Sequence, residues 1–262
     1  MLRRKTPARK EMDSVMKKEE EYLKKYREKT DSLLNRKLEE KVPDNLQSKL
    51  DTAFSKAFAL VFEKGTGVIE KTYSRERHMS GYEVNAELAD KKETRKNLKN
   101  FKKRASRSGG KNLIISGIEG VGLGFLGIGI PDIPLFTAMI LKSMYETALH
   151  YGYDYEKEEE RYFILKIIET SLSCGDALDE GNRAVDIFIE DGTLPEDYSR
   201  SGQIEKTSSM LSKKLLYMKF LQGIPVAGVV GGIYDSVYMR RINRYAALKY
   251  RKRFLKDRIS KR

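Results

Sequence analysis

Five acidic residues in the middle of the sequence are of the kind that performs general acid and base catalysis or binds a hard metal ion. They are Asp132, Glu146, Asp154, Glu158 and Glu169. Asp132 lies in a proline-rich turn and Asp154 precedes a helix, so both side chains can cap backbone amides, and Glu158 lies in a first helical turn, where negative charge is favoured. We therefore expect structural roles for this set, and an enzyme that uses it is the third hypothesis for function.

Four polar residues are predicted to be buried, because they lie in or next to stretches with an apolar face. They are Glu146, Asp154, Arg161 and Asp235. A charged side chain rarely leaves water without a partner of opposite charge. The sequence therefore predicts structural ion pairs at these positions, in preference to catalysis.

A glycine-rich run at residues 122–127 reads Gly-Leu-Gly-Phe-Leu-Gly, and Glu146 follows about 20 residues later. This spacing satisfies the fingerprint of dinucleotide-binding folds, in which a strand precedes the glycines and an uninterrupted helix follows them. Pro131 and Pro134 fall where that helix would run. Because proline interrupts helices, the sequence argues against a dinucleotide site.

The residues most often used for metal binding and nucleophilic catalysis are scarce. The chain has two histidines, His78 and His150, without zinc-type spacing, and one cysteine, Cys174, with no His or Lys close to it in sequence. We therefore predict no catalytic residue, no metal ligand and no cofactor. A single cysteine and the absence of a signal peptide after Met1 favour the reducing, cytoplasmic side of the membrane.

The net charge of +13 is unevenly distributed along the 262 residues. Residues 1–111 have 30 basic and 18 acidic side chains, which gives a net charge of +12. Residues 201–262 have 15 basic and 3 acidic side chains, which also gives +12. Residues 112–200 have 6 and 17, a net charge of −11. Basic flanks of this kind indicate an anionic partner surface, either phospholipid or nucleic acid, unless the zones pair internally.

The pattern of apolar residues predicts a mainly α protein. We expect a charged helical extension over residues 1–45, solvated along its length, and a single helical domain over residues 46–262. Within the domain the predicted helices lie near residues 46–63, 91–111, 113–125, 135–151, 156–174, 176–190, 196–221 and 234–262. Gly175 is predicted to end one of these helices.

Two apolar segments are broken by glycine and proline and share the sequence Gly-Ile-Pro. Small residues on successive turns let helices approach closely, so we predict that each segment forms a hairpin-like structure and that the two pack together. The alternatives are an apolar wedge in a membrane and the core of a soluble helix bundle. The residues of this membrane or packing motif are Gly127, Gly129, Pro131, Asp132, Pro134, Gly223, Pro225, Gly228, Gly231 and Gly232.

The densest basic runs directly adjoin these apolar segments, since residues 91–111 precede the first and residues 240–262 follow the second. Cations beside a bilayer are attracted to anionic lipid. No nucleic-acid-binding module is recognisable, so an anionic membrane surface is the predicted partner and nucleic acid is not. The residues predicted to bind this surface are Lys102, Lys103, Arg104, Arg240, Arg241, Arg244, Arg251 and Arg253.

Several ordered motifs resemble those of the EcsC family of bacterial proteins. They are the run from Gly127 to Phe136, the runs 141–149, 151–155 and 159–165, the segment Gly223–Gly228, and the tyrosine-rich helix around residues 245–254. The resemblance covers roughly residues 50–255 and leaves the first 45 uncovered. The family pattern often has Asn where this chain has Asp235, which argues against a special role for that carboxylate.

The resemblance implies no chemical reaction, but its founding member is encoded beside an ABC transporter. We therefore expect a non-catalytic accessory or regulatory protein at the inner face of the cell membrane, linked to a transporter or to secretion. The alternative is a soluble helical protein that binds a transporter or another protein partner.

Overall fold

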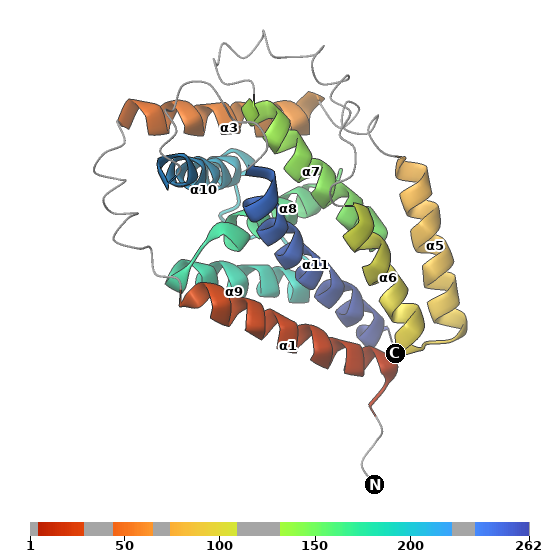
Figure 1. Cartoon of the computed structure of the whole chain (residues 1–262). Helices are drawn as coiled ribbons and strands as arrows, with labels where there is room; N and C mark the ends of the chain where they lie inside the picture. The colour runs from red at the N-terminus through yellow and green to blue at the C-terminus, as the bar shows by residue number, and fades with distance from the viewer. Residues whose placement is uncertain (1–4, 29–43, 65–73, 109–131, 222–233, 262) are drawn as a thin grey trace.

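The computed structural model describes residues 5–28, 44–64, 74–108, 132–221 and 234–261, and every regular element in these ranges is an α-helix. The helices are α1 (Pro7–Arg27), α3 (Asp44–Lys64), α5 (Arg75–Lys91), α6 (Arg95–Ser108), α7 (Asp132–His150), α8 (Glu158–Leu172), α9 (Gly175–Asp191), α10 (Arg200–Leu221) and α11 (Tyr234–Ser260). The prediction of a mainly α, single-domain protein is confirmed (Figure 1).

Helix α8 lies at the centre of the fold, where it contacts α9, α10 and α11 (Figure 1). Its residues Phe163, Ile164, Leu165, Ile167 and Ile168 are all fully buried. Consecutive apolar residues point to different sides of a helix, so burial of the whole run means that neighbours cover α8 on most of its circumference. Helices α9, α10 and α11 therefore enclose α8, and the remaining helices pack mainly against these three and against one another.

Helices α7 and α11 lie side by side and run in the same direction (Figure 1). Ser143 of α7 donates a hydrogen bond of 2.8 Å to Asn243 of α11. Farther along both helices, Tyr151 stacks on Tyr250, with ring centroids 6.3 Å apart, and also contacts Phe254. Because the contacts advance together along the two helices, both helices begin at the same end of the molecule.

Helices α3 and α10 pack closely against each other, and α3 also contacts α7. The side chains predicted to form the core face of α3 are all buried, at 8% exposure or less, namely Leu50, Phe54, Ala57, Phe58 and Val61. Gln47 of α3 donates a 2.6 Å hydrogen bond to Ser212 of α10, and Ser212 in turn donates to Asp51. The prediction of a helix with a core face is confirmed here.

Helix α1 is packed against α11, α9 and α6 (Figure 1). Its residues Ala8, Val15 and Tyr22 repeat every seven positions, and all three are buried. The Tyr22 ring packs on Tyr245 of α11 at 5.2 Å, and its hydroxyl donates to the backbone oxygen of Ser171. The prediction of a solvated N-terminal helix is therefore wrong for α1, although the helix itself is present and highly charged.

The connection between α8 and α9 also differs from the prediction. Gly175 does not end a helix: α8 already ends at Leu172, and Gly175 is the first residue of α9, with a φ of +56°. Only glycine adopts positive φ without strain, so Gly175 permits the sharp turn between two adjacent helices. At the other end of α9, Gly192 adopts the left-handed conformation expected of a helix cap.

Helices α5 and α6 form a hairpin that covers one side of α7 (Figure 1). Leu98 and Phe101, the two large apolar residues of basic helix α6, are buried at 2% and 1% exposure. A Cβ atom at Gly152 would lie 2.3 Å from the Tyr82 ring of α5, so only glycine permits this close approach. Aromatic contacts are thus part of what attaches the hairpin to the core.

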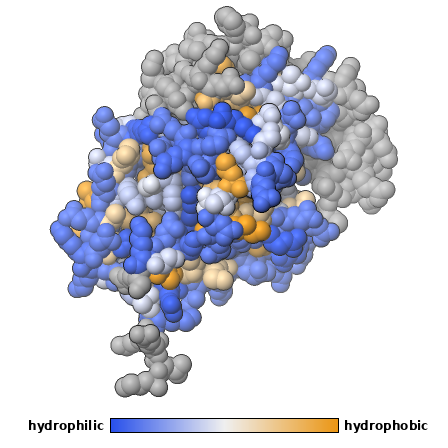
Figure 2. Space-filling model, turned by 180° about the vertical axis from the view of Figure 1, so that it is seen from behind, coloured by the Kyte–Doolittle hydropathy of each residue, from blue (hydrophilic) through white to orange (hydrophobic). Residues whose placement is uncertain are grey.

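The surface seen from behind in Figure 2 is mostly hydrophilic, with small hydrophobic patches between the charged side chains. In the described ranges no helix has both the length and the apolar character needed to cross a bilayer.

Candidate functional site

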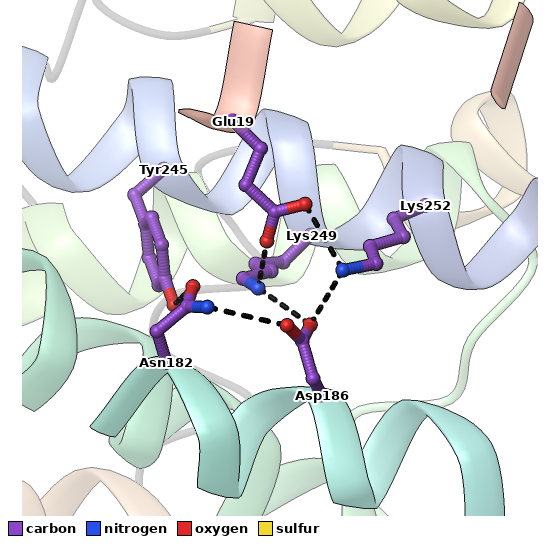
Figure 3. Close-up of polar contacts among 6 residues, drawn as sticks. All are labelled: Glu19, Asn182, Asp186, Tyr245, Lys249 and Lys252. Carbon is purple, nitrogen blue, oxygen red and sulfur yellow. Dashed lines mark hydrogen bonds and ion pairs between the residues drawn. The ribbon is translucent and has the colours of Figure 1, made fainter. Parts of the chain in front are cut away.

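The most distinctive polar site is a network of buried charges where α1, α9 and α11 meet (Figure 3). Lys249 of α11 has no exposed surface, yet its ammonium group forms an ion pair with Glu19 of α1 and lies 2.6 Å from Asp186 of α9. Lys252, one turn farther along, lies 3.0 Å from Glu19 and 2.9 Å from Asp186. Two lysines therefore share two carboxylates.

Hydrogen bonds from uncharged residues extend this network. Asn182 of α9 donates to Asp186 at 3.2 Å, and the Tyr245 hydroxyl of α11 donates to the Asn182 carbonyl oxygen at 2.8 Å (Figure 3). The neighbouring Gly181 brings α9 close to α8, because a Cβ atom there would lie 2.5 Å from Thr170 Oγ1. The close packing at Gly181 thus helps to position Asn182 and Asp186.

Two further buried carboxylates pair with cations of α11. Glu11 of α1, whose side chain is fully enclosed, forms ion pairs with Arg251 and, at 2.6 Å, with Arg95 of α6. Glu160 of α8 accepts a 2.6 Å hydrogen bond from Arg253 and a 2.5 Å bond from the Tyr250 hydroxyl. The basic C-terminal helix therefore forms ion pairs with α1, α8 and α9, and Glu11 also joins it indirectly to Arg95 of α6.

The electrostatics of these groups reflect their burial. Burial lowers the pKa of Lys249, although Glu19 and Asp186 act in the opposite direction. Burial also opposes charge on Lys252, but there the two carboxylates prevail and the pKa is raised. The Glu160 carboxyl has a raised pKa, again because burial outweighs the nearby Arg253. These closely paired groups are suited to holding the helices in register. None of them is a solvent-exposed charge without a partner of opposite sign.

Three of the cations predicted to bind an anionic surface are instead held inside the protein. Arg251 and Arg253 pair with Glu11 and Glu160, and only 8% of Arg241 is exposed. Arg241 donates a hydrogen bond to the backbone oxygen of Ser173, and its guanidinium lies 3.9 Å from the centre of the Tyr26 ring. The prediction is wrong for these three residues in this conformation, because the carboxylates and aromatic rings that enclose them are remote in sequence.

The other predicted cations differ from these. Arg240 and Arg244 are exposed on the first turns of α11. Lys102, Lys103 and Arg104 belong to α6, but their side chains lie outside the described part of the structure. The prediction of surface binding stays a prediction for these five residues.

Of the four polar residues predicted to be buried, Glu146 is buried as predicted, whereas Asp154 and Arg161 are only half-buried. Glu146 is 5% exposed, and its carboxylate lies 4.0 Å from Lys142 one turn earlier on α7. Burial raises the pKa of Glu146 to about 7, although Lys142 partly opposes this. Arg161 of α8 lies 5.6 Å from the centre of the Phe62 ring, and the side chain of Asp235 is outside the described residues.

Four of the five acidic residues that could have formed a catalytic or metal centre each have a different cation, and the side chain of the fifth, Asp132, is outside the described residues. Asp154 pairs with Arg75, Glu158 with Arg200, and Glu169 with Lys166. The residues described by the structure contain no group of three His, Cys, Asp or Glu side chains that could bind a metal ion. The structural interpretation of these carboxylates agrees with this separation.

Most of the glycine and proline motif lies outside the described residues, including Gly127, Gly129, Pro131 and the residues Gly223 to Gly232. Asp132 is the first residue of α7, and Pro134 lies in its first turn, where proline is tolerated. Pro134 therefore marks the beginning of a helix, in agreement with the predicted break before residue 135.

Several members of the charge network were not predicted, among them Glu19, Asn182, Asp186, Tyr245 and Lys249. A signal for two of the carboxylates is present in the sequence. Glu11 and Glu19 fall on the same helical stripe as Ala8, Val15 and Tyr22, with spacings of three and four residues. A carboxylate within an apolar stripe indicates a buried partner of opposite charge.

Comparison with known proteins agrees with the motifs in the sequence. The model of the EcsC protein family matches residues 7–255, so the match includes α1 and begins well before residue 50, where the resemblance was expected to start. The chain is 22% identical to Protein EcsC of Bacillus subtilis (strain 168) over 227 residues, which cover 85% of this chain and 86% of that protein. No solved structure gave a significant match. Because the family match spans nearly the whole sequence, the chain belongs to the EcsC protein family.

Proposed function

We propose that this EcsC family member is a non-catalytic accessory or regulatory protein that associates with the inner face of the cell membrane and acts on a transporter or on secretion. The observation that carries the proposal is the parallel arrangement of α7 and α11, fixed by the Ser143–Asn243 hydrogen bond. Each of these helices directly follows one of the two apolar Gly-Ile-Pro segments in the sequence. Both segments therefore lead into helices that begin at the same end of the described fold, and we propose that this end faces the lipid.

Exposed cations near the start of α11 support the same orientation. Val237, Arg240 and Arg244 are spaced by three and four residues, so they lie on one helical face, and all three are exposed. An apolar residue beside cations suits the interface between hydrocarbon and lipid headgroups. Each cation near an anionic membrane contributes about 1 kcal/mol of attraction, so these two residues would add to insertion of the apolar segments.

Vesicle flotation with the full chain tests this proposal. We expect binding to vesicles that contain phosphatidylglycerol, weaker binding to pure phosphatidylcholine, and loss of the difference at high salt, because salt screens exposed charges. The double variant Arg240→Glu and Arg244→Glu should bind anionic vesicles roughly tenfold or more weakly.

The matched control reverses two exposed cations far from this end, with Lys10→Glu and Lys17→Glu on α1. Both residues lie in the part of α1 that includes Glu11. Glu11 pairs with Arg251, which is in the second half of α11, away from Arg240 and Arg244. The control has the same change in net charge, so equal loss of binding in both variants would show a general charge effect. Absence of binding to either kind of vesicle would overturn the membrane proposal and favour a soluble protein that is recruited by a protein partner.

A further inference from the structure

The only two histidines of the chain contact each other. His78 in α5 and His150, the last residue of α7, are 72 positions apart in sequence, yet His78 Nδ1 lies 3.2 Å from His150 Nε2. The ring centroids are 4.5 Å apart, and the rings meet edge to face at 75°. At this distance one ring donates a hydrogen bond to the other, so the pair joins the α5–α6 hairpin to the core.

The surroundings of the pair favour neutral rings. His150 is buried, with 7% exposure, and His78 is half-buried. The pKa of His78 is lowered, chiefly by burial and further by the positive charges of Arg77 on the same helix and Lys142 on α7. The nearest carboxylate along α7 is Glu146, which is already paired with Lys142.

Several other ionisable groups of α5 have partners away from the histidine pair. Arg75, near the start of the helix, pairs with Asp154 and Glu156 in the turn after α7. Toward the end of the helix, Tyr82 contacts Phe101 of α6, and Asp90 pairs with Arg258 of α11. These contacts hold the two ends of α5, whereas the histidine pair holds the part of α5 between Arg75 and Tyr82.

The same surroundings argue against a metal site. Two imidazoles supply two ligands, and the described residues contain no third His, Cys, Asp or Glu side chain in a position to complete such a group. Positive charge on Arg77 and Lys142 would repel a metal cation as it repels a proton. Protonation is therefore the chemistry that this pair performs within the normal pH range.

We propose that the His78–His150 pair is a proton-sensitive clasp, which holds α5 against α7 at neutral pH and releases this contact when acidification protonates both rings. A hydrogen bond between two imidazoles needs one donor and one acceptor nitrogen. When one proton is added to the pair, one ring still offers a lone pair to the other. When both rings are protonated, both contacting nitrogens are donors and both rings are cations. The contact is then repulsive, and Arg77 and Lys142 add to the repulsion.

Histidine NMR on the unmodified chain gives a direct test, because only two histidines contribute signals. We expect two separate titration steps as the pH falls. The second step should have a pKa below the usual histidine value, because the second ring must gain its positive charge next to a ring that is already protonated. In parallel, hydrogen exchange of α5 is compared with that of α9, which serves as an internal reference for the pH dependence of exchange. Between about pH 7.5 and about pH 5.5, protection of α5 relative to α9 should fall by up to roughly tenfold for each histidine whose pKa the contact lowers, because pH 5.5 is about one unit below the usual histidine pKa.

Amide variants keep the contact and remove the titration. His78→Asn places an amide near the position of Nδ1, and His150→Gln places one near Nε2, so the double variant can retain a hydrogen bond. Its α5 protection should no longer depend on pH in this range. A Glu146→Gln variant is the control for the other group that titrates nearby, and it should keep the pH response. Two histidines that titrate independently at the usual pKa, or a pH response that survives in the double variant, would overturn the proposal.

Discussion

Glu19 of α1 and Lys249 of α11 are 230 residues apart in the sequence and form an ion pair whose lysine side chain is completely buried. The pair joins the helix that begins the described fold to the helix that ends it. Because Asp186 and Lys252 share the same contacts, each charge in this group has two partners of opposite sign.

Removal of the Glu19 carboxylate should destabilise the protein strongly. Glu19→Ala leaves the buried Lys249 with Asp186 as its remaining partner, and loss of one member of a buried pair costs about 3 kcal/mol. The free energy of unfolding in urea measures this loss. The adjacent Glu20 is exposed, so Glu20→Ala should have little effect. A double variant, Glu19→Leu with Lys249→Met, should regain much of the stability, and failure to regain any would contradict an electrostatic cause.

The stability of the protein should depend on pH through Glu146. The pKa of Glu146 in the folded protein is about 7, above the value of 4.5 for a free glutamate, so the folded state binds the proton more tightly. This contribution to stability is fully present below pH 4.5 and is lost as the pH rises through 7. Relative to wild type, Glu146→Gln should therefore gain stability with rising pH, by roughly 3 kcal/mol at pH 8 and above.

Urea unfolding at several pH values checks this prediction. The exposed Glu87 provides a control, since Glu87→Gln should show the same pH dependence as wild type. A constant difference between Glu146→Gln and wild type across the pH range would show that the carboxyl titrates normally.

The close approach of α8 and α9 should make Gly181 sensitive to substitution. In Gly181→Ala the new methyl group would lie 2.5 Å from Thr170 Oγ1, and such overpacking costs about 1 to 3 kcal/mol. Thr170→Ala removes the atoms in conflict, so the double variant should recover part of the loss. In Gly202→Ala the nearest atom, Ser199 Cβ, lies at 3.6 Å, so this substitution should be neutral or stabilise the helix by up to about 1 kcal/mol. Thermal melting of the four variants gives the comparison.

Two arginines seven residues apart on α11 should behave in opposite ways. Arg251→Gln removes a partner of the enclosed Glu11 and should cost about 2 to 3 kcal/mol of stability. Arg244→Gln changes an exposed side chain, so stability should stay within about 0.5 kcal/mol while binding to anionic vesicles weakens. Urea unfolding and vesicle flotation are measured on both variants. A result in which Arg251→Gln reduced vesicle binding but not stability would contradict this assignment.

Most of the described helices could be predicted from the sequence because helical periodicity is local, although α5 was not among the predicted helices. The core face of α3 is an example, since Leu50, Phe54 and Phe58 are spaced by four residues and all are buried. The environment of a charge is not local. Arg251 and Arg244 are similar in the sequence, but Arg251 is enclosed because Glu11, 240 positions earlier, lies opposite it.

The same limit applies to α1 and to the histidines. Glu11 and Glu19 occupy two positions of the buried stripe of α1. Without the positions of their cationic partners, a stripe that contains two carboxylates resembles a solvent-exposed face. His78 and His150 belong to helices whose contact no local pattern indicates. Contacts between distant segments therefore decide which polar residues form the interior of this protein.

Docking of α1 against α11 has a consequence for synthesis of the chain. The ribosome releases α1 before any other helix described here and α11 after all of them, so Glu11 and Glu19 emerge more than 200 residues before Arg251 and Lys249, their partners on α11. Until then Glu19 lacks both of its lysine partners, and Tyr22 lacks the Tyr245 ring on which it packs. Completion of the described fold therefore waits for α11, the last of its helices to be synthesised.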